Sequence, residues 1–315
     1  MQKSQVIRAA VVLSLSILVA LAAGTLTGCQ AAKAVGSIFN PTPALPATGT
    51  DLPKRVVVVP FRSTLSQYVP RSLAIGRHLE KALKANPGTV LVDYRVLEAA
   101  MQRLTAPGIT EVDQQLYAAR LTGINTVVRG ALVDISVRRE LKGLYGFREN
   151  IPFLGLEAQF IILDAGSGTQ VGERSIRRQV KITEVMAEGL EMGKKPKAEL
   201  LDQLQAELEK EAAQWVVAKI ADQPWNGMIL EVDGERVKVT GGTDNGLAKG
   251  AELLVLRRGE PIKTGAGRTL FLTGKQVARV RLTEVGKAVS WAEVIGGDKK
   301  GKKIVLRPGQ VVRIP

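Results

Sequence analysis

Residues 54 to 61 read Lys-Arg-Val-Val-Val-Val-Pro-Phe, and this stretch decides the fold of the first half of the chain. Four consecutive valines leave no polar face, so the run predicts a central strand that is buried on both sides and stops at Pro60. A helix is expected to follow it. The stretch therefore predicts a sheet with helices packed against it.

Helical and strand patterns alternate after this run. Pro70 suits the first turn of a helix, and Asn86-Pro87-Gly88 end it. Residues 90 to 92 predict a second short strand, and Asp93 can cap a helix that carries its apolar side chains on one face. A further short helix is expected over residues 116 to 121.

Three longer strands and a long helix complete this domain. Apolar and polar side chains alternate over residues 127 to 137, 154 to 162 and 176 to 182, and a turn joins the last two strands as a hairpin. Residues 198 to 221 have the pattern of an amphipathic helix. The order β-α-β-α-α-β-β-β-α predicts a mixed-sheet α/β domain with packed helices over residues 54 to 224.

A second domain is expected over residues 227 to 315, after the boundary at Pro224-Trp225-Asn226-Gly227. Short apolar runs alternate there with glycine turns and no helical stripe is present, which is typical of a small β-barrel. Asp233-Gly234 favours a tight hairpin between the first two runs. We therefore expect an α+β chain.

The first 28 residues resemble a bacterial lipoprotein signal peptide. Lys3 and Arg8 precede an apolar core of about 15 residues, fewer than the roughly 20 that a spanning helix needs. Leu26-Thr27-Gly28-Cys29 then matches the lipobox of lipoprotein signal peptidase, with small residues that let the enzyme approach the backbone. The match implies a diacylglyceryl thioether and a further acyl chain, such as palmitate, on Cys29.

Residues 29 to 53 are expected to form the lipidated start of the mature chain and a Pro-rich tether. Four prolines lie there among small residues, and a flexible coil of about 24 residues spans roughly 27 Å. In lipoproteins of Gram-negative type, a residue other than Asp after the cysteine implies transfer to the outer membrane, and Gln30 stands at that position. We expect a protein held on the outer membrane that faces the periplasm.

Composition excludes several classes of function. One Cys and one His leave no His/Cys metal cluster, no disulfide and no Ser-His or Cys-His nucleophile with a spare base. Lys and Arg total 44 against 30 Asp and Glu, but nucleic acid is a poor partner on the periplasmic side. Peptidoglycan carboxylates, lipopolysaccharide phosphates, anionic lipid or an acidic protein suit the charge better. We expect no enzyme activity, no metal and no cofactor besides the lipid on Cys29.

Several stretches resemble the CsgG/HfaB family of outer-membrane lipoproteins, which act in curli secretion and holdfast anchoring. Residues 118 to 130 read A-A-R-L-T-G-I-N-T-V-V-R-G and residues 161 to 168 read I-I-L-D-A-G-S-G, in addition to the lipobox and the valine strand. Curli pore lipoproteins insert two β-hairpins per subunit, at positions that correspond to Arg138–Pro152 and Glu184–Lys197. Neither segment holds two membrane strands of about 9 to 11 alternating residues, so the periplasmic fold is expected without the pore.

The C-terminal region resembles the SH3-like barrel of the flagellar H-ring protein FlgT. The likeness rests on residues 241 to 253 and on the closing Pro308-Gly309-Gln310-Val311-Val312. It implies a small SH3-like β-barrel domain. This region is also the more basic one.

Two basic stretches are candidate interaction surfaces. Each is either a solvated loop or a contact for a neighbouring subunit or an anionic envelope polymer. The first consists of Arg138, Arg139, Lys142, Tyr145, Phe147 and Arg148, and the second of Lys299, Lys300, Lys302 and Lys303. The glycine-rich loop from Gly241 to Gly250 lacks the Gly-Lys-Ser/Thr ending of a phosphate cradle, which favours a connecting turn. His78 is expected to be a solvated or partly packed helix residue.

These observations lead to one hypothesis and one alternative. The hypothesis is a non-enzymatic outer-membrane lipoprotein, a structural or assembly component of a secretion, flagellar or surface-structure anchoring machine, either as a homo-oligomer or in an envelope complex. The alternative is a tethered lipoprotein that activates a peptidoglycan synthase.

Overall fold

The computed structural model describes residues 52–104, 109–143, 148–264, 269–297 and 305–315. All of them belong to one compact unit, Gly49–Pro315. The predicted signal peptide and nearly all of the predicted tether lie outside the described residues.

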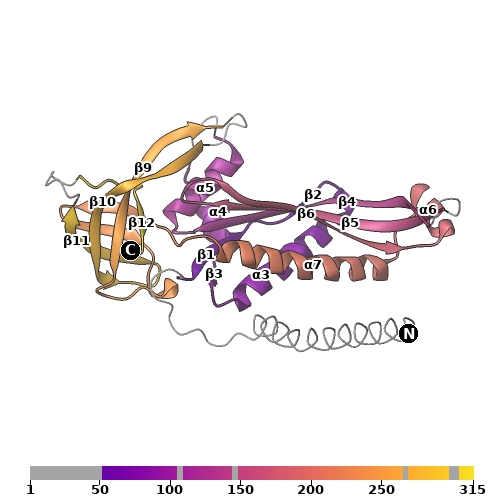
Figure 1. The fold of residues 1–315 in the computed structure, drawn as a ribbon, viewed down its shortest axis with the longest axis horizontal. Coiled ribbons are helices and arrows are strands. Elements are labelled where there is room, and N and C mark those ends of the chain that lie inside the picture. Colours follow the sequence, from indigo (N-terminus) through magenta and orange to yellow (C-terminus); the bar gives the residue numbers. More distant parts are fainter. Residues whose placement is uncertain (1–51, 105–108, 144–147, 265–268, 298–304) are drawn as a thin grey trace, which may run out of the picture. The chain divides into compact units, whose positions relative to one another are not determined.

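The first part of this unit is a mixed sheet with the strand order β3-β1-β4-β5-β6 (Figure 1). β1 pairs in parallel with β3 and β4, whereas β4, β5 and β6 are antiparallel, and the short β2 pairs in parallel with β4. The strands are β1 Lys54–Val58, β2 Arg62–Ser63, β3 Thr89–Leu91, β4 Thr126–Lys142, β5 Glu149–Asp164 and β6 Gln170–Lys181. The helices are η1 Ser66–Tyr68, α3 Val69–Ala85, α4 Tyr94–Gln102, α5 Glu111–Leu121, α6 Glu184–Glu191 and α7 Ala198–Ala221.

The alternation of the valine run places β1 in two hydrophobic cores. Val56 and Val58 pack in the core that contains the buried side chains of α3 and α7. Val57 and Val59 pack in the core formed with α4 and α5. Helices therefore cover both faces of the sheet at β1, which confirms the prediction of a buried central strand.

Several boundaries differ from the sequence prediction, including the start of β6 at Gln170 rather than at residue 176. α5 begins at Glu111 rather than at residue 116, because the Thr110 hydroxyl accepts a hydrogen bond from the Asp113 amide at 3.1 Å and caps the helix. β4 runs on to Lys142 and β5 begins at Glu149, so Arg138–Pro152 is largely strand. The segment Glu184–Lys197 begins with helix α6.

The predicted C-terminal barrel is confirmed, and it is closed. Six antiparallel strands pair in the order β10-β11-β8-β7-β12-β9 around an apolar core. The fold class is therefore α+β, with a mixed-sheet part and a small barrel. The barrel elements are β7 Gly227–Asp233, β8 Arg236–Thr240, η2 Thr243–Asn245, β9 Glu252–Lys263, β10 Thr269–Val285, β11 Val289–Gly297 and β12 Val311–Arg313.

Polar contacts join the barrel to the sheet. The Arg55 guanidinium forms an ion pair with Asp244 of η2, and both side chains are about nine-tenths buried. The Asn245 side chain donates to the Pro53 carbonyl at 2.7 Å. On β10, the Phe271 amide donates to the Ser167 carbonyl at 2.7 Å. These bonds tie η2 and β10 to the loops and strands of the sheet.

None of the helices in the described parts of the chain is both long and apolar enough to span a membrane.

Candidate functional site

We call β4 from Asp134 to Lys142, together with the facing parts of β5 and β6, the extended half of the sheet. Its two faces differ in character. Side chains alternate along a strand, so Asp134, Ser136 and Arg138 share one face while Ile135 and Val137 share the other. Ile135 and Val137 pack against the core that contains α3 and α7. The first face carries charged and polar side chains and is called the charged face below.

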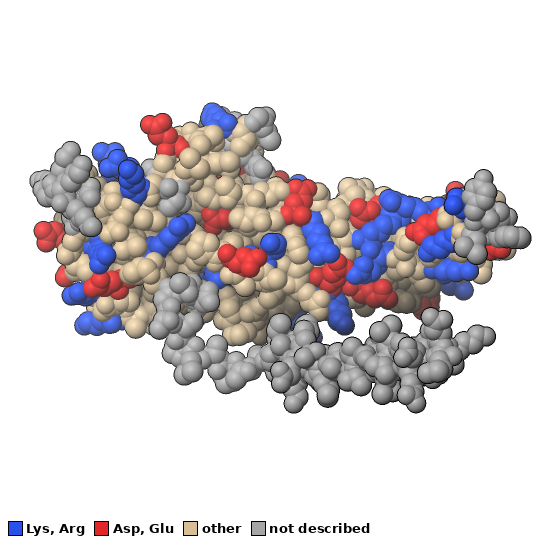
Figure 2. Space-filling view, in the orientation of Figure 1, with Lys and Arg blue, Asp and Glu red and all other residues tan. Residues whose placement is uncertain are grey.

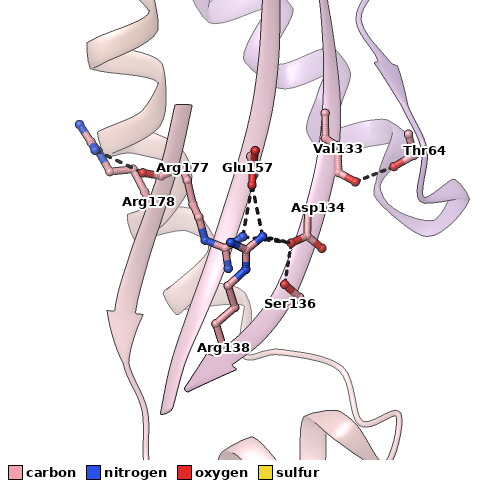
Figure 3. Close-up of polar contacts among 8 residues, drawn as sticks. All are labelled: Thr64, Val133, Asp134, Ser136, Arg138, Glu157, Arg177 and Arg178. Atoms are coloured by element: carbon pink, nitrogen blue, oxygen red, sulfur yellow. Dashed lines mark hydrogen bonds and ion pairs between the residues drawn. The ribbon is translucent and has the colours of Figure 1, made fainter. Parts of the chain in front are cut away.

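The charged face holds a cluster of two carboxylates and two guanidinium groups (Figure 3). Arg177 of β6 donates to Asp134 of β4 at 3.0 Å and to Glu157 of β5 at 3.3 Å. Arg138 lies 3.6 Å from Asp134 and 3.7 Å from Glu157. The Ser136 hydroxyl donates to Asp134 at 2.6 Å. The cluster joins all three strands and has no net charge.

A glycine on β5 makes room for this arrangement. Gly155 faces Ser136 on one side and Gln179 on the other. A Cβ at Gly155 would lie 2.1 Å from Arg177 Nη2, so the guanidinium lies directly over the bare backbone. This lets Arg177, with a side chain only 17% exposed, reach across β5 to a carboxylate on β4.

The cluster keeps Asp134 ionised. Burial alone would raise the pKa of Asp134, but hydrogen bonds from Ser136 and Arg177 and the charges of Arg177 and Arg138 outweigh it and hold the pKa below its ordinary value. A carboxylate of this kind is a poor proton donor near neutral pH. The cluster is therefore suited to holding the three strands together.

A β-bulge at Val133 sets the position of the cluster. Leu132 faces Ala158 and Asp134 faces Glu157, so Val133 is an extra residue on β4. Thr64 holds the bulge from the neighbouring chain segment. Its amide donates to the Leu132 carbonyl at 3.1 Å, and its hydroxyl donates to the Val133 carbonyl at 2.7 Å (Figure 3).

The structure separates the residues of the first predicted interaction surface. Arg138 and Lys142 belong to the charged face, where Lys142 lies 3.0 Å from Glu140 and 4.4 Å from the ring centre of Phe153. Arg139 points the other way and pairs with Glu184 and Glu191 of α6, so it fastens that helix to β4. The part of this surface from Arg138 to Lys142 is thus strand, not a loop. Arg148 is exposed.

Other predicted residues stand as follows. Tyr145 and Phe147 lie outside the described residues, as do Lys299, Lys300, Lys302 and Lys303 and the lipobox residues Leu26, Thr27, Gly28 and Cys29. His78 lies on α3, with its ring nitrogen Nδ1 3.1 Å from a Glu209 carboxylate oxygen. The loop from Gly241 to Gly250 connects β8 to β9 through η2.

The opposite face of the extended half borders a groove that the sequence did not indicate. The groove is open to solvent and has a volume of about 420 Å³. Its apolar side consists of Ile135 and Val137 of β4 and the buried Leu154 of β5. Its rim is formed by the η1 region on one side and by the end of α6 and the loop before α7 on the other: Leu65, Gln67, Tyr68, Leu190, Glu191, Gly193, Lys194, Lys195 and Pro196.

Charged side chains of both signs are interspersed over the part of the surface that β4, β5 and β6 form in Figure 2. No group of three or more His, Cys, Asp or Glu side chains in the described residues is placed to hold a metal ion.

No family model matches the chain, and no curated protein matches it either. A hypothetical protein from Chlamydia trachomatis is 10% identical, with 53% of this chain and 99% of that chain covered and a TM-score of 0.33. Lipoprotein GNA1162 from Neisseria meningitidis is 13% identical over 54% of this chain and 100% of that one, with a TM-score of 0.28. The LpoB C-terminal domain from Escherichia coli is 15% identical over 44% and 88%, with a TM-score of 0.27. These scores are low, and we conclude nothing about function from them.

Proposed function

We propose that the chain is a lipid-anchored protein of the outer membrane that faces the periplasm and acts as a non-enzymatic docking or assembly component of an envelope machine. The observation that carries the proposal is Leu26-Thr27-Gly28-Cys29 directly after a short apolar core. Two or three acyl chains at Cys29 would hold the chain firmly, because each buried methylene contributes about 0.8 kcal/mol.

The described surfaces support a docking role over a catalytic one. In the charged face, Asp134 and Glu157 are engaged by Arg138 and Arg177. The groove on the opposite face has an apolar side and a partly basic rim, and such a surface suits a partner's side chains. The machine that we propose is one for secretion, flagellar assembly or surface-structure anchoring.

The anchoring part of the proposal is tested by changing Cys29 to alanine. Wild type is expected in the outer-membrane fraction of a density gradient, with an acylated N-terminal cysteine in its mass spectrum. The Cys29→Ala form is expected to lack the acyl mass and to leave that fraction. If both forms remain equally attached, or if the wild-type terminus is not acylated, the proposal is wrong.

The assembly part is tested by the mass of the purified protein in mild detergent. Rings or other large oligomers, or co-purification with an envelope complex, would support it. A monomer that raises the turnover of a purified peptidoglycan synthase would contradict the assembly role and support the alternative of a tethered synthase activator.

A further inference from the structure

β4 loses one of its neighbours halfway along the sheet. β1 pairs with β4 as far as Val128 and β2 pairs with it as far as Leu132, whereas β5 follows it to Lys142. From Asp134 onward, no strand within the described part of the chain lies on the β2 side of β4. The backbone groups that point away from β5 therefore form a free edge, which is a template for a further strand.

The chain turns away from β4 at the point where this edge begins. After Thr64 binds the bulge at Val133, the chain enters η1 instead of continuing beside β4. Leu65 and Tyr68 then form part of the rim of the groove. The edge is therefore left open beside a preformed apolar surface.

The groove lies against this edge. Ile135, Ser136 and Val137 of β4 all contribute to its lining. A strand rises about 3.3 Å per residue and turns alternate side chains to the same face, so a strand added here would direct every second side chain into the groove. A volume of about 420 Å³ lies within the usual range of roughly 300 to 1,000 Å³ for ligand pockets.

The rim of the groove is positive. Lys194 and Lys195 are exposed and form no ion pair among the residues that the structure describes. The acidic residue of the rim, Glu191, shares Arg139 with Glu184, so these three side chains leave one negative charge against the two positive charges of the lysines. The stem of Lys194 rests on α6, because a Cβ at Gly189 would lie 3.2 Å from its Cδ. Carboxylates of an occupant would complement these two ammonium groups.

We propose that the free edge of β4 and the groove bind an extended segment of a partner protein whose groove-facing side chains, at every second position, are apolar beside Ile135 and Val137 and acidic beside Lys194 and Lys195. The segment pairs with β4 as an added strand, places its apolar side chains against Ile135 and Val137, and brings its carboxylates to Lys194 and Lys195. Main-chain hydrogen bonds supply affinity in this mode, and the alternating side chains supply specificity.

A second copy of the chain fits this edge less well. Its own long edge strand would be β6, whose charged side chains are mostly basic and would meet a basic rim. The strand at the other end of the sheet, β3, has three residues, and the free edge of β4 itself carries more basic than acidic side chains from Asp134 to Lys142. An acidic partner segment has the charge that these edges lack.

This inference rests on the proposed docking role. Peptide binding is measured on the purified full chain in mild detergent, so it is independent of the test for the lipid on Cys29. Absence of peptide binding would therefore contradict this inference without contradicting the lipid anchor. The probe is a fluorescein-labelled peptide, Val-Thr-Leu-Thr-Glu-Thr-Glu, whose apolar and acidic side chains lie on one face of a strand, and the readout is fluorescence anisotropy. Saturable binding is expected. The double variant Lys194→Glu with Lys195→Glu should weaken it at least about tenfold, whereas Lys249→Glu, the same charge change at an exposed barrel residue, should leave it unchanged.

A second peptide tests the pairing of the backbones. N-methylation of alternate amides removes the donors of one edge and keeps the side chains, so this peptide should bind at least about tenfold more weakly. Equal binding of the two peptides would overturn strand addition. The proposal of an acidic occupant would be wrong if the probe did not bind at millimolar concentration. It would also be wrong if the lysine variants bound the probe as tightly as wild type. If the lysine variants change the oligomeric state instead, the occupant is a second copy and the proposal is wrong.

Discussion

Replacing Arg177 by methionine tests whether the charged cluster stabilises the extended half of the sheet. Methionine keeps an unbranched stem above Gly155 but removes the guanidinium that binds Asp134 at 3.0 Å and Glu157 at 3.3 Å. Only Arg138, at 3.6 and 3.7 Å, then remains beside two carboxylates that face one another across β4 and β5. Like charges directly opposite destabilise a sheet.

The expected loss follows from opposing terms. At an effective dielectric constant of about 20, each ion pair of Arg177 attracts by on the order of 5 kcal/mol. The cost of desolvating a guanidinium with a side chain 17% exposed offsets much of this attraction, and solvent screens Asp134, whose side chain is 32% exposed. We expect the variant to lose about 2 kcal/mol of unfolding free energy at neutral pH.

The loss should shrink in acid. Because the pKa of Asp134 in the folded state lies below 3.8, its stabilising contribution is present above that pH and is lost as the pH falls through the folded-state pKa. Removing Arg177 raises the pKa of Asp134 toward or above 3.8, so the variant lacks this contribution at neutral pH. Once Asp134 is protonated in both proteins, this part of the difference between them disappears.

Urea denaturation followed by far-ultraviolet circular dichroism measures the effect, because the α-helices of the described residues all belong to the sheet part. Arg281→Met is a matched control. It removes an exposed pair with Glu252 on the barrel and should change the free energy by less than about 1 kcal/mol. An Arg177→Met variant as stable as wild type at neutral pH, or a loss of equal size at about pH 3, would refute the reasoning.

Three further substitutions are checked by the same denaturation experiment. Gly155→Ala places a Cβ 2.1 Å from Arg177 Nη2 and should cost about 1 to 3 kcal/mol, with little further cost when it is combined with Arg177→Met. Thr64→Val keeps the shape of the side chain but removes the bond to the Val133 carbonyl, and it should cost about 1 kcal/mol. Leu208→Ala opens a cavity under α7, where Leu208 is fully buried, and should cost about 2 to 5 kcal/mol; a loss below about 1 kcal/mol would contradict the packing described for α7.

Sequence patterns within or beside the element were enough to predict β1, α4 and α7. The valine run predicted a strand buried on both faces, and alternate valines do lie in two different cores. Asp93 caps α4 through the Arg95 amide, as expected. The pattern over residues 198 to 221 matched α7 at both ends. In each case, the residues that decide the element lie within it or beside it.

The extended half was harder to predict because its partners are far apart in sequence. Arg139 is compensated by Glu191, which lies on a helix 52 residues later. Residues 138 to 142 carry charged side chains on both faces, so they did not match the alternating apolar and polar pattern that predicts a strand. The groove combines residues from four separate segments, so no local sequence pattern indicates it. A glycine inside an alternating strand, Gly155, was the one available signal of a close approach.

The anchoring of α7 has a consequence for the strength of partner binding. Six of its side chains are buried along its length, and near its far end the Lys54 ammonium donates to the Ala221 carbonyl at 3.3 Å. The helix α7, which follows the loop at the rim of the groove, is thus already fixed before a partner binds. Most of the conformational entropy lost on binding is therefore that of the partner segment. At about 1 to 2 kcal/mol per ordered residue, a six-residue segment would bind transiently on its own. Durable attachment would then require several copies engaged at once on a common surface.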